Sequence, residues 1–389
     1  MEVNIEILNR IKNNDESLTK LGLSNNYIDS SGAQALAKAI EKNRTLTSIN
    51  LYDSKIGIQG VLAFANALKV NTTLISLMLY GNGIDAAGTE VLAKALEQNK
   101  SLTSLGLEEN IIGDAGAQAL AKALKINKTI TSLSLEENNI GDEGALALAE
   151  ALETNDTLIS LDLYRNKIGT IGAEALAKAL KKNKTLFSLD MFRNNIGVSG
   201  AEVLAKALEK NYTLTTLNIS ANMIDTIGAQ ALAKALETNN TITSIDIWGN
   251  NTSPNGAKAL ADALVKNCTL TSLTLDSNEI NSRPESVDLI STFNDIDLAS
   301  GTIELNIKKE INELLTRNKA IYQSVMKLTV RIQNLQQQSA QGLNLQLNKS
   351  DLYEEFKKYI PEGIDDETMK QMFNTTIDKL LKKAKPITF

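Results

Sequence analysis

A 28-residue repeat is the feature of this sequence that most restricts its fold. The pattern Leu18-x-x-Leu21-x-Leu23-x-x-Asn26-x-Ile28 begins again, without insertion, at positions 46, 74, 102, 130, 158, 186, 214, 242 and 270. A fixed period of about 20–50 residues is the signature of a solenoid, in which each unit buries its apolar face against its neighbours. The chain is therefore expected to form an elongated array of ten units.

Each unit divides into two halves with different periodicities. The first half alternates apolar and polar residues, which is typical of a short strand. The second half carries Gly-Ala-x-x-Leu-Ala-x-Ala-Leu, as at residues 116–124, with apolar residues at helical spacing and many alanines. We expect Leu21 and Leu23 of the strand to pack against Leu36 and Ile40 of the helix, so each unit predicts a β-strand followed by an α-helix.

These motifs resemble the leucine-rich repeat, in the long form found in ribonuclease inhibitor, in Ran GTPase-activating proteins and in NOD-like receptors. The resemblance covers residues 18–284. It implies an α/β fold, a right-handed horseshoe-shaped solenoid with a parallel sheet on the concave side and helices on the convex side. The likeness to Ran GTPase activators is at the level of the repeat, and no signature for acting on a GTPase accompanies it.

Two columns of asparagine recur with the period. The first column, in which Ser54 is the one departure, is expected to satisfy backbone groups where each strand turns; it consists of Asn26, Asn82, Asn110, Asn138, Asn166, Asn194, Asn222, Asn250 and Asn278. The second column follows the helices, where asparagine tolerates a left-handed cap; it consists of Asn43, Asn71, Asn99, Asn127, Asn155, Asn183, Asn211, Asn239 and Asn267. Both columns are interpreted as structural, not catalytic.

The segments on either side of the repeats lack the period. Residues 1–17 are predicted to contain a capping helix, and residues 285–389 an all-α module with a long helix over about 302–338. That helix carries apolar residues at alternating spacings of four and three, interrupted by Asn318. The seam over residues 307–335 predicts either a helix packed in a small bundle or a coiled coil that makes a homo-oligomer.

Composition excludes several chemistries. The chain has no histidine and a single cysteine, Cys268, so no histidine-dependent triad, imidazole metal ligand or disulfide framework can form, and no catalytic, metal or cofactor site is predicted. A net charge of −6 argues against nucleic acid as a partner. No apolar stretch is long enough for a membrane span, and the N-terminus has no Sec-type signal. We expect a cytoplasmic protein or, alternatively, one that a specialised non-Sec system secretes into a host cell cytosol.

The exposed column of the sheet carries most of the functional signal. The position after the third leucine of each unit points to the concave surface, because side chains alternate along a strand. Five of its ten residues are aromatic, although only 4% of all residues are. With the charged residues that flank them, the candidate partner-binding residues are Tyr52, Tyr80, Glu108, Glu136, Asp162, Tyr164, Arg165, Asp190, Phe192, Arg193, Asp246 and Trp248.

Three interpretations of this column stay open. Tyrosine, tryptophan and arginine dominate binding hot spots, so the concave face is predicted to bind a protein with basic residues between apolar anchors. The rings could instead only stack along the sheet and stabilise it. In the third interpretation, the C-terminal module folds back onto this face and is itself the ligand.

The predicted function is a non-enzymatic protein–protein interaction scaffold. The alternative is a bacterial secreted effector, or a regulator of a host enzyme or GTPase, in which the repeats select the target and residues 285–389 act on it. Leucine-rich-repeat ubiquitin ligases of bacterial pathogens carry a catalytic cysteine in a helical C-terminal domain. This sequence has no cysteine there, which argues against that activity.

Overall fold

The computed structural model describes residues 4–24, 28–276, 278, 307–321 and 323, together with helical residues 353, 354, 356, 357, 369, 370, 373 and 374. Asn26 of the first asparagine column lies outside the described residues. So do most of the predicted helix over 302–338, the second part of the seam over 307–335, and most of the predicted module over 285–389.

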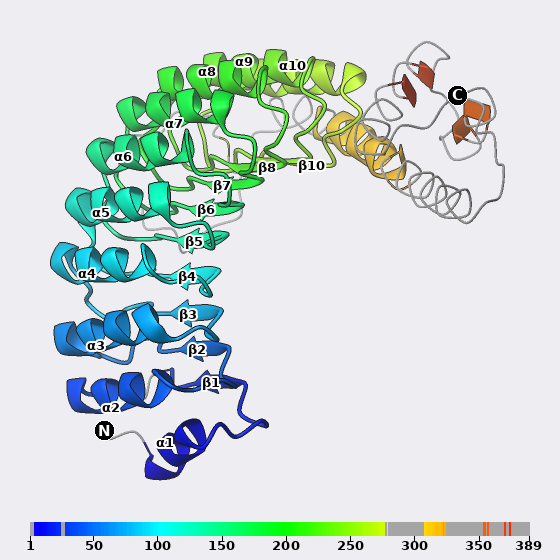
Figure 1. Ribbon diagram of the computed structural model, residues 1–389. Helices are drawn as coiled ribbons and strands as arrows, with labels where there is room; N and C mark the ends of the chain where they lie inside the picture. Colours follow the sequence, from blue (N-terminus) through cyan, green and yellow to red (C-terminus); the bar gives the residue numbers. More distant parts are fainter. Residues whose placement is uncertain are drawn as a thin grey trace, which may run out of the picture.

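The repeats form a curved solenoid in which each short strand is followed by a helix (Figure 1). Ten strands make one parallel sheet in chain order, so each strand pairs with the next unit along. The register is one whole repeat, as in the pairing of Leu105 with Leu133 and of Leu133 with Leu161. Strands line the inner side of the arc and helices the outer side, which confirms the predicted α/β solenoid (Figure 1).

The strands are three residues long, because each unit must turn after its third leucine. They are β1 Lys20–Gly22, β2 Ser48–Asn50, β3 Ser76–Met78, β4 Ser104–Gly106, β5 Ser132–Ser134, β6 Ser160–Asp162, β7 Ser188–Asp190, β8 Thr216–Asn218, β9 Ser244–Asp246 and β10 Ser272–Thr274. The helices are α1 Ile5–Lys12, α2 Ser30–Ile40, α3 Gly57–Val70, α4 Ala86–Leu96, α5 Gly113–Ile126, α6 Asp142–Leu152, α7 Thr170–Lys182, α8 Gly197–Leu208, α9 Thr226–Leu236 and α10 Pro254–Lys266.

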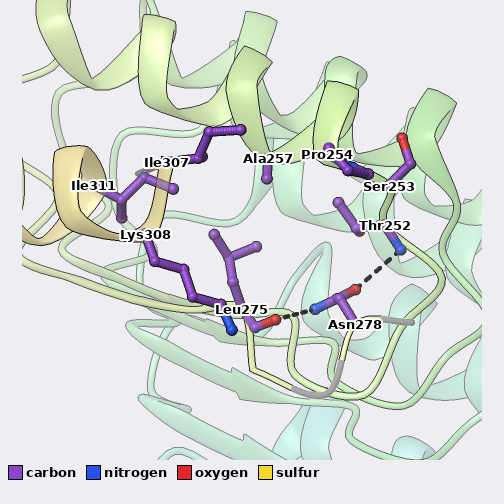
Figure 2. Close-up of a pocket in the computed structure, with 9 residues that line it drawn as sticks. All are labelled: Thr252, Ser253, Pro254, Ala257, Leu275, Asn278, Ile307, Lys308 and Ile311. Carbon is purple, nitrogen blue, oxygen red and sulfur yellow. Dashed lines mark hydrogen bonds between the residues drawn. The ribbon is translucent and has the colours of Figure 1, made fainter. Parts of the chain in front are cut away.

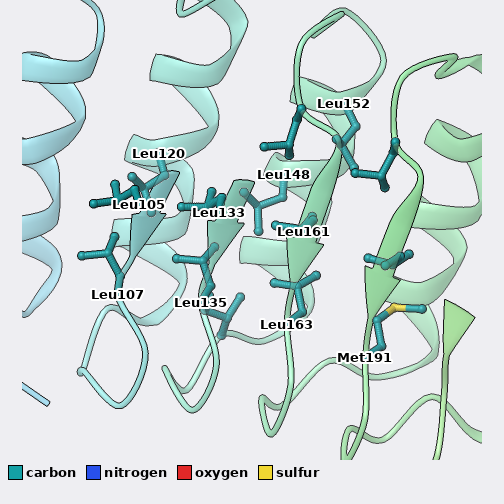
Figure 3. Close-up of a cluster of buried hydrophobic side chains, with 14 of the residues drawn as sticks. Leu105, Leu107, Leu120, Leu133, Leu135, Leu148, Leu152, Leu161, Leu163 and Met191 are labelled. Atoms are coloured by element: carbon teal, nitrogen blue, oxygen red, sulfur yellow. The ribbon is translucent and has the colours of Figure 1, made fainter. Parts of the chain in front are cut away.

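The hydrophobic core runs continuously between the sheet and the helices. Leu105 and Leu107 of the fourth unit and Leu120 of α5 are all buried and meet the same set from the next unit (Figure 3). Burying one leucine is worth about 1.5–3 kcal/mol. A Cβ on Gly116 would lie 2.5 Å from Cγ2 of Ile112, so the first turn of this helix needs glycine to approach its neighbours.

Both asparagine columns form buried hydrogen-bond ladders between units. In the first column, Asn166 donates from Nδ2 to the carbonyl of Leu135 at 2.9 Å, and its Oδ1 accepts the N–H groups of Asn138 and Ile140 at 3.1 and 2.9 Å. Ser54 replaces part of this pattern by donating to the carbonyl of Leu23 at 2.9 Å. The column is structural, as the sequence predicts.

The second asparagine column does not adopt the left-handed cap that we predicted. Asn127 has φ −67° and ψ 133°, an extended conformation. Its Nδ2 donates to the carbonyl of Leu96 at 2.7 Å, and its Oδ1 accepts the N–H groups of Thr129 and Ile130 at 2.9 and 2.8 Å. Asparagine is needed here because a buried amide can both donate and accept between units, not because of backbone freedom.

Aspartate side chains cap several helices, either their own helix or the helix of the next unit. Asp29 caps its own helix by accepting the N–H of Gly32 at 2.9 Å. Asp114 of α5 instead accepts the N–H groups of Gly141 and Gly144 at 2.7 and 2.9 Å, which caps α6 of the next unit. Capping of a helix N-terminus is worth about 1 kcal/mol, so these aspartates also bind one unit to the next.

The described helix over 307–321 covers the last repeat. Ile307, Ile311 and Leu315 are buried in the core that continues from the solenoid. Figure 2 shows Ile307 and Ile311 facing Ala257 and Leu275 around a small, mainly apolar pocket. The first part of the predicted seam therefore packs against the repeats of the same chain.

Two side chains of this helix continue the second asparagine ladder. Arg317 donates from Nη2 to the carbonyls of Leu264 and Asn267 at 2.7 and 3.2 Å. These are the two carbonyls that an asparagine of an eleventh unit would reach. Asn318 is fully buried and donates to the carbonyls of Asn267 and Leu270 at 3.0 and 2.7 Å. At the other end, Asn43 donates to the carbonyl of Ile11 in α1 at 2.7 Å, so both ends of the ladder are closed.

Candidate functional site

Strand alternation places the candidate residues on the concave face. In the fifth unit, Leu133 and Leu135 are buried, whereas Ser134 and Glu136 between and after them are partly exposed. The column after the third leucine is a row of partly or fully exposed side chains along the sheet, with the buried Ser220 as its one exception. The residues that the sequence singled out are therefore side by side, about 4.8 Å apart from strand to strand.

The aromatic side chains form two groups. The rings of Tyr52 and Tyr80 stack with their centroids 4.2 Å apart, and those of Tyr164 and Phe192 stack at 4.8 Å. Trp248 joins the second group, with its ring centroid 5.9 Å from that of Phe192. Strands β4 and β5 separate the two groups, and no aromatic residue occupies the column there.

Sequence reasoning missed the contact between Phe192 and Trp248, which lie two strands apart. The residue between them in the column is Ser220, which is only 1% exposed. Its hydroxyl lies 2.6 Å from Oδ1 of Asp246 and 2.8 Å from Oδ1 of Asn218. A small residue at this position leaves room for the two rings to meet, so Ser220 belongs to the aromatic surface although it carries no ring.

Carboxylates fill the interval between the aromatic groups. A Cβ on Gly106 would lie 2.7 Å from Oε2 of Glu108, so the absence of a side chain on β4 lets this carboxylate lie close to the sheet. Glu136 follows on β5 and Asp162 ends β6. Among the described residues, no salt bridge neutralises these three acids. Glu108, Glu136 and Asp162 therefore form an acidic floor on the sheet between the two aromatic groups.

The turn after each strand presents a second charged column in left-handed backbone. Glu109, Glu137, Arg165 and Arg193 have φ between 47° and 50°, whereas Gly249 adopts the same conformation without strain. The charge changes sign along this column, from acidic on the early turns to basic on the later ones. Asp53, Gly81 and Ala221 have the same positive φ, so the conformation belongs to the repeat and only the side chain varies from unit to unit.

The two arginines are anchored to the aromatic surface. Arg165 forms a salt bridge with Glu137, a residue outside the predicted set. Its guanidinium carbon lies 5.9 Å from the centroid of the Tyr164 ring, and that of Arg193 lies 5.7 Å from the centroid of the Phe192 ring. Cation–π contacts of this length hold the guanidinium groups at the rim of the site.

Comparison with known families decides the identity of the repeat. The family described as Leucine Rich repeat matches residues 14–37, 98–121, 127–149, 154–177, 182–205 and 210–233. The chain is a leucine-rich repeat protein. Its 28-residue strand–helix unit is of the ribonuclease-inhibitor type, and repeats of this kind indicate a protein–protein interaction scaffold. A search of curated proteins found no significant match.

Solved structures similar to this leucine-rich repeat protein include the following three. LegL7 from Legionella pneumophila is 18% identical, with 80% of this chain and 96% of that chain covered and a TM-score of 0.44. Leiomodin-1 actin-binding site 2 is 22% identical, with coverage of 54% and 92% and a TM-score of 0.30. The tropomodulin C-terminal domain from Caenorhabditis elegans is 14% identical, with coverage of 46% and 93% and a TM-score of 0.32.

Three acids of this leucine-rich repeat face, Glu136, Asp162 and Asp190, have a pKa above that of an isolated carboxyl group. Burial, followed by the neighbouring carboxylates with Asp162 foremost, raises the pKa of Glu136 to about 7. Burial also raises the pKa of Asp162 to about 6, although the N–H bond from Tyr164 opposes the shift. The pKa of Asp190 is raised by burial in the same way. A cation brought to this floor would favour the ionised carboxylates.

The described residues of the leucine-rich repeat protein provide neither a membrane span nor a metal site. In the part of the chain that the structure describes, no helix combines the length and apolar composition that a bilayer crossing requires. Within the same residues, no group of three or more histidine, cysteine, aspartate or glutamate side chains is arranged to hold a metal ion.

Proposed function

We propose that the leucine-rich repeat protein is a non-enzymatic scaffold that binds a partner protein on its concave face. The proposed contacts are the twelve residues predicted from the sequence, extended by Glu137. One observation carries the proposal. Partly exposed aromatic rings lie on both sides of Glu108, Glu136 and Asp162, and no cation among the described residues forms a salt bridge with these three acids. A surface of this composition gains most from a partner that covers the rings and supplies positive charge.

The partner that this surface favours is a protein with basic residues between apolar anchors. Lysine or arginine would meet the floor formed by Glu108, Glu136 and Asp162. Apolar or aromatic side chains would pack on the Tyr80 side and on the Tyr164 side. Truncating a hot-spot aromatic residue typically costs about 2 kcal/mol or more of binding free energy, whereas a stacked pair on the sheet is worth only about 0.5–1.5 kcal/mol of stability.

The chain division that accompanies this proposal is a cap in residues 1–17, a repeat domain in 18–284 and a helical module in 285–389. Because Arg317 and its helix close the last repeat, a protein cut at residue 284 would lose that cover. Binding experiments are therefore best made with point variants of the full chain.

The test replaces Tyr80, Tyr164 and Trp248 together by alanine and compares partner capture from a cell lysate, by quantitative mass spectrometry, with the unaltered chain. The expected result is the loss of specifically enriched proteins at unchanged helical content. The matched control replaces Tyr212, a tyrosine that is 64% exposed in the loop between α8 and β8, by alanine. Equal capture by the triple variant and the unaltered chain would reject the concave face as the site.

A further inference from the structure

The second asparagine column coincides with the acceptor motif for N-glycosylation. That motif is asparagine, any residue except proline, and then threonine or serine. A hydroxyl-bearing residue follows every asparagine of the column at the second position, and the residue between them is never proline. These residues are Thr45, Thr73, Ser101, Thr129, Thr157, Thr185, Thr213, Thr241 and Thr269. All nine asparagines are therefore acceptors in the unfolded chain.

The folded chain hides every one of these asparagines. All nine are between 0% and 4% exposed. An N-linked glycan is bulky and polar, so it belongs on the surface of a protein. The asparagines of this column can therefore be modified only before the units pack against one another.

The hydrogen-bond ladder accounts for the motif without any role for glycosylation. Oδ1 of Asn127 accepts the N–H of Thr129 at 2.9 Å, and the hydroxyl of Thr129 lies 3.3 Å from the same oxygen. In another unit the hydroxyl of Thr73 reaches the carbonyl of Asn43 at 3.3 Å. An asparagine with a small hydroxyl residue two positions later thus serves the contact between units, and the fold alone explains why the motif recurs.

The ladder also uses both hydrogens of the amide nitrogen. Nδ2 of Asn127 donates to the carbonyl of Leu96 at 2.7 Å and to the carbonyl of Asn99 at 3.2 Å. N-glycosylation breaks one N–H bond and joins Nδ2 to the first sugar carbon, while the proton is released and the lipid diphosphate that carried the glycan leaves. A glycan on Nδ2 would therefore remove one ladder bond and place a sugar where a buried carbonyl lies, so the modified unit could not close on its neighbour.

We propose that the second asparagine column makes this fold incompatible with N-glycosylation, and that the chain folds and meets its partner in a compartment without an oligosaccharyltransferase. That enzyme modifies chains as they enter the endoplasmic reticulum, before the units can close. The proposal goes beyond the concave-face function and does not rest on it. It restricts the partner to proteins that are present in such a compartment.

A variant that loses the motif and keeps the ladder makes the test direct. In the nine hydroxyl-bearing positions threonine is replaced by valine and serine by alanine, and Thr252→Val removes a further motif at the buried Asn250. The backbone N–H groups that bond the asparagines remain. Among the described residues, Oγ1 of Thr241 and of Thr252 has no hydrogen-bond partner to lose. Motifs outside the two columns stay in place as a record that the enzyme acts on the variant; they belong to Asn218, Asn251, Asn348 and Asn374.

The experiment directs both full chains into the endoplasmic reticulum of cultured animal cells with a cleavable signal peptide. Mass spectrometry after glycan removal in heavy-oxygen water measures the occupancy of each asparagine, and limited proteolysis measures folding. We expect the column of the unaltered chain to be occupied. Its yield of secreted, protease-resistant protein should be at least about tenfold below that of the variant, because each glycan leaves a buried carbonyl without a donor. Restoring Thr129 alone in the variant should reproduce the loss through one glycan on Asn127.

Two further arms separate glycosylation from other causes of poor folding. In the bacterial cytoplasm, which lacks the enzyme, both chains should give the same circular dichroism spectrum and nearly the same melting temperature. In the animal cells, an inhibitor of lipid-linked oligosaccharide synthesis should raise the yield of the unaltered chain to that of the variant. This arm needs no substitution, so it tests the proposal even where the variant is unstable.

Three results would overturn the inference. The first is an unaltered chain that is secreted in folded form with its column unmodified, and the second is a chain that carries the glycans and still folds. The third is a low yield that neither the variant nor the inhibitor restores. None of them bears on the concave face, which partner capture with the substitutions at Tyr80, Tyr164 and Trp248 tests separately.

Discussion

The buried and the exposed face of the sheet differ in how much their residues vary along the solenoid. We call the buried face the constant face and the exposed face the variable face. The buried face holds nearly the same leucines and asparagines in every unit, because each must fill the same space and bond the same carbonyls of its neighbour. The exposed face changes from Tyr80 to Glu136 to Trp248 over the same backbone. In a repeat protein the constant positions therefore report what the fold requires, and the variable ones report what the surface does.

The largest loss of stability is expected for a substitution on the constant face in the middle of the array. Leu133→Ala removes a buried side chain that packs against Leu105 and Leu161, and we expect the free energy of unfolding to fall by about 3–4 kcal/mol. Urea unfolding followed by circular dichroism measures it. Ser134→Ala, one residue later on the exposed face, should change it by less than about 0.5 kcal/mol. Equal losses for the two variants would contradict the division between the faces.

The second prediction concerns the hydrogen bonds of the constant face. Asn166→Ala leaves the carbonyl of Leu135 and two buried N–H groups without partners, which should cost about 2–3 kcal/mol of stability. The matched control is Asn195→Ala, because Asn195 is exposed. We expect the control to unfold at nearly the urea concentration of the unaltered chain. A small effect at Asn166 would mean that water replaces the amide.

The constant face was predictable from sequence and the variable face only in part. The period located the strands, the helices and the Asn166 column, because burial forces the same residue into every unit. The left-handed cap at Asn127 was wrong, since spacing does not reveal whether asparagine is chosen for its backbone or for its amide. The contact between Trp248 and Phe192 depends on the small side chain of Ser220 on the strand between them. The type of one residue alone does not reveal such space between strands.

The C-terminal end of the array was also beyond sequence reasoning. Arg317 takes the place of a repeat asparagine although it lies 50 residues after Asn267 and in a helix without the period. Only the geometry of the last unit, with its free carbonyls, explains why an arginine is needed there. The coiled-coil seam over 307–335 was inferred from spacing alone, and spacing cannot distinguish a partner helix from the exposed end of a solenoid.

The third prediction concerns Arg317, which covers the C-terminal end of the solenoid. Arg317→Ala should cost about 1–2 kcal/mol, because hydrogen bonds from a charged group to the carbonyls of Leu264 and Asn267 are lost at a partly exposed position. Hydrogen exchange should show faster opening of α10 and unchanged protection in α4. Lys319→Ala on the same helix, which alters an exposed side chain, should leave both unchanged. Uniform loosening of all units would contradict a local closing role.

The smallest expected effect tests whether the ionised carboxylate of Glu136 on the exposed face lowers the free energy of unfolding. The pKa of Glu136 is raised from 4.5 in a free side chain to about 7 in the folded protein. The folded state therefore holds this proton more tightly than the unfolded chain. Its stabilising contribution is complete below about pH 4.5 and is lost as the pH rises to about 7.

Glu136→Gln imitates the protonated carboxyl at every pH. We expect it to raise the free energy of unfolding at pH 8 by about 1 kcal/mol, after allowance for solvent screening of a partly exposed group, and to leave stability at pH 4 unchanged. Glu90→Gln is the control of opposite sign. The hydrogen bond from Lys94 holds the pKa of Glu90 below its usual value, so this variant should be less stable than the unaltered chain at pH 8. If both variants lost stability at pH 8, Glu136 would be an ordinary surface carboxylate, and the acidic floor would have no need of a basic partner.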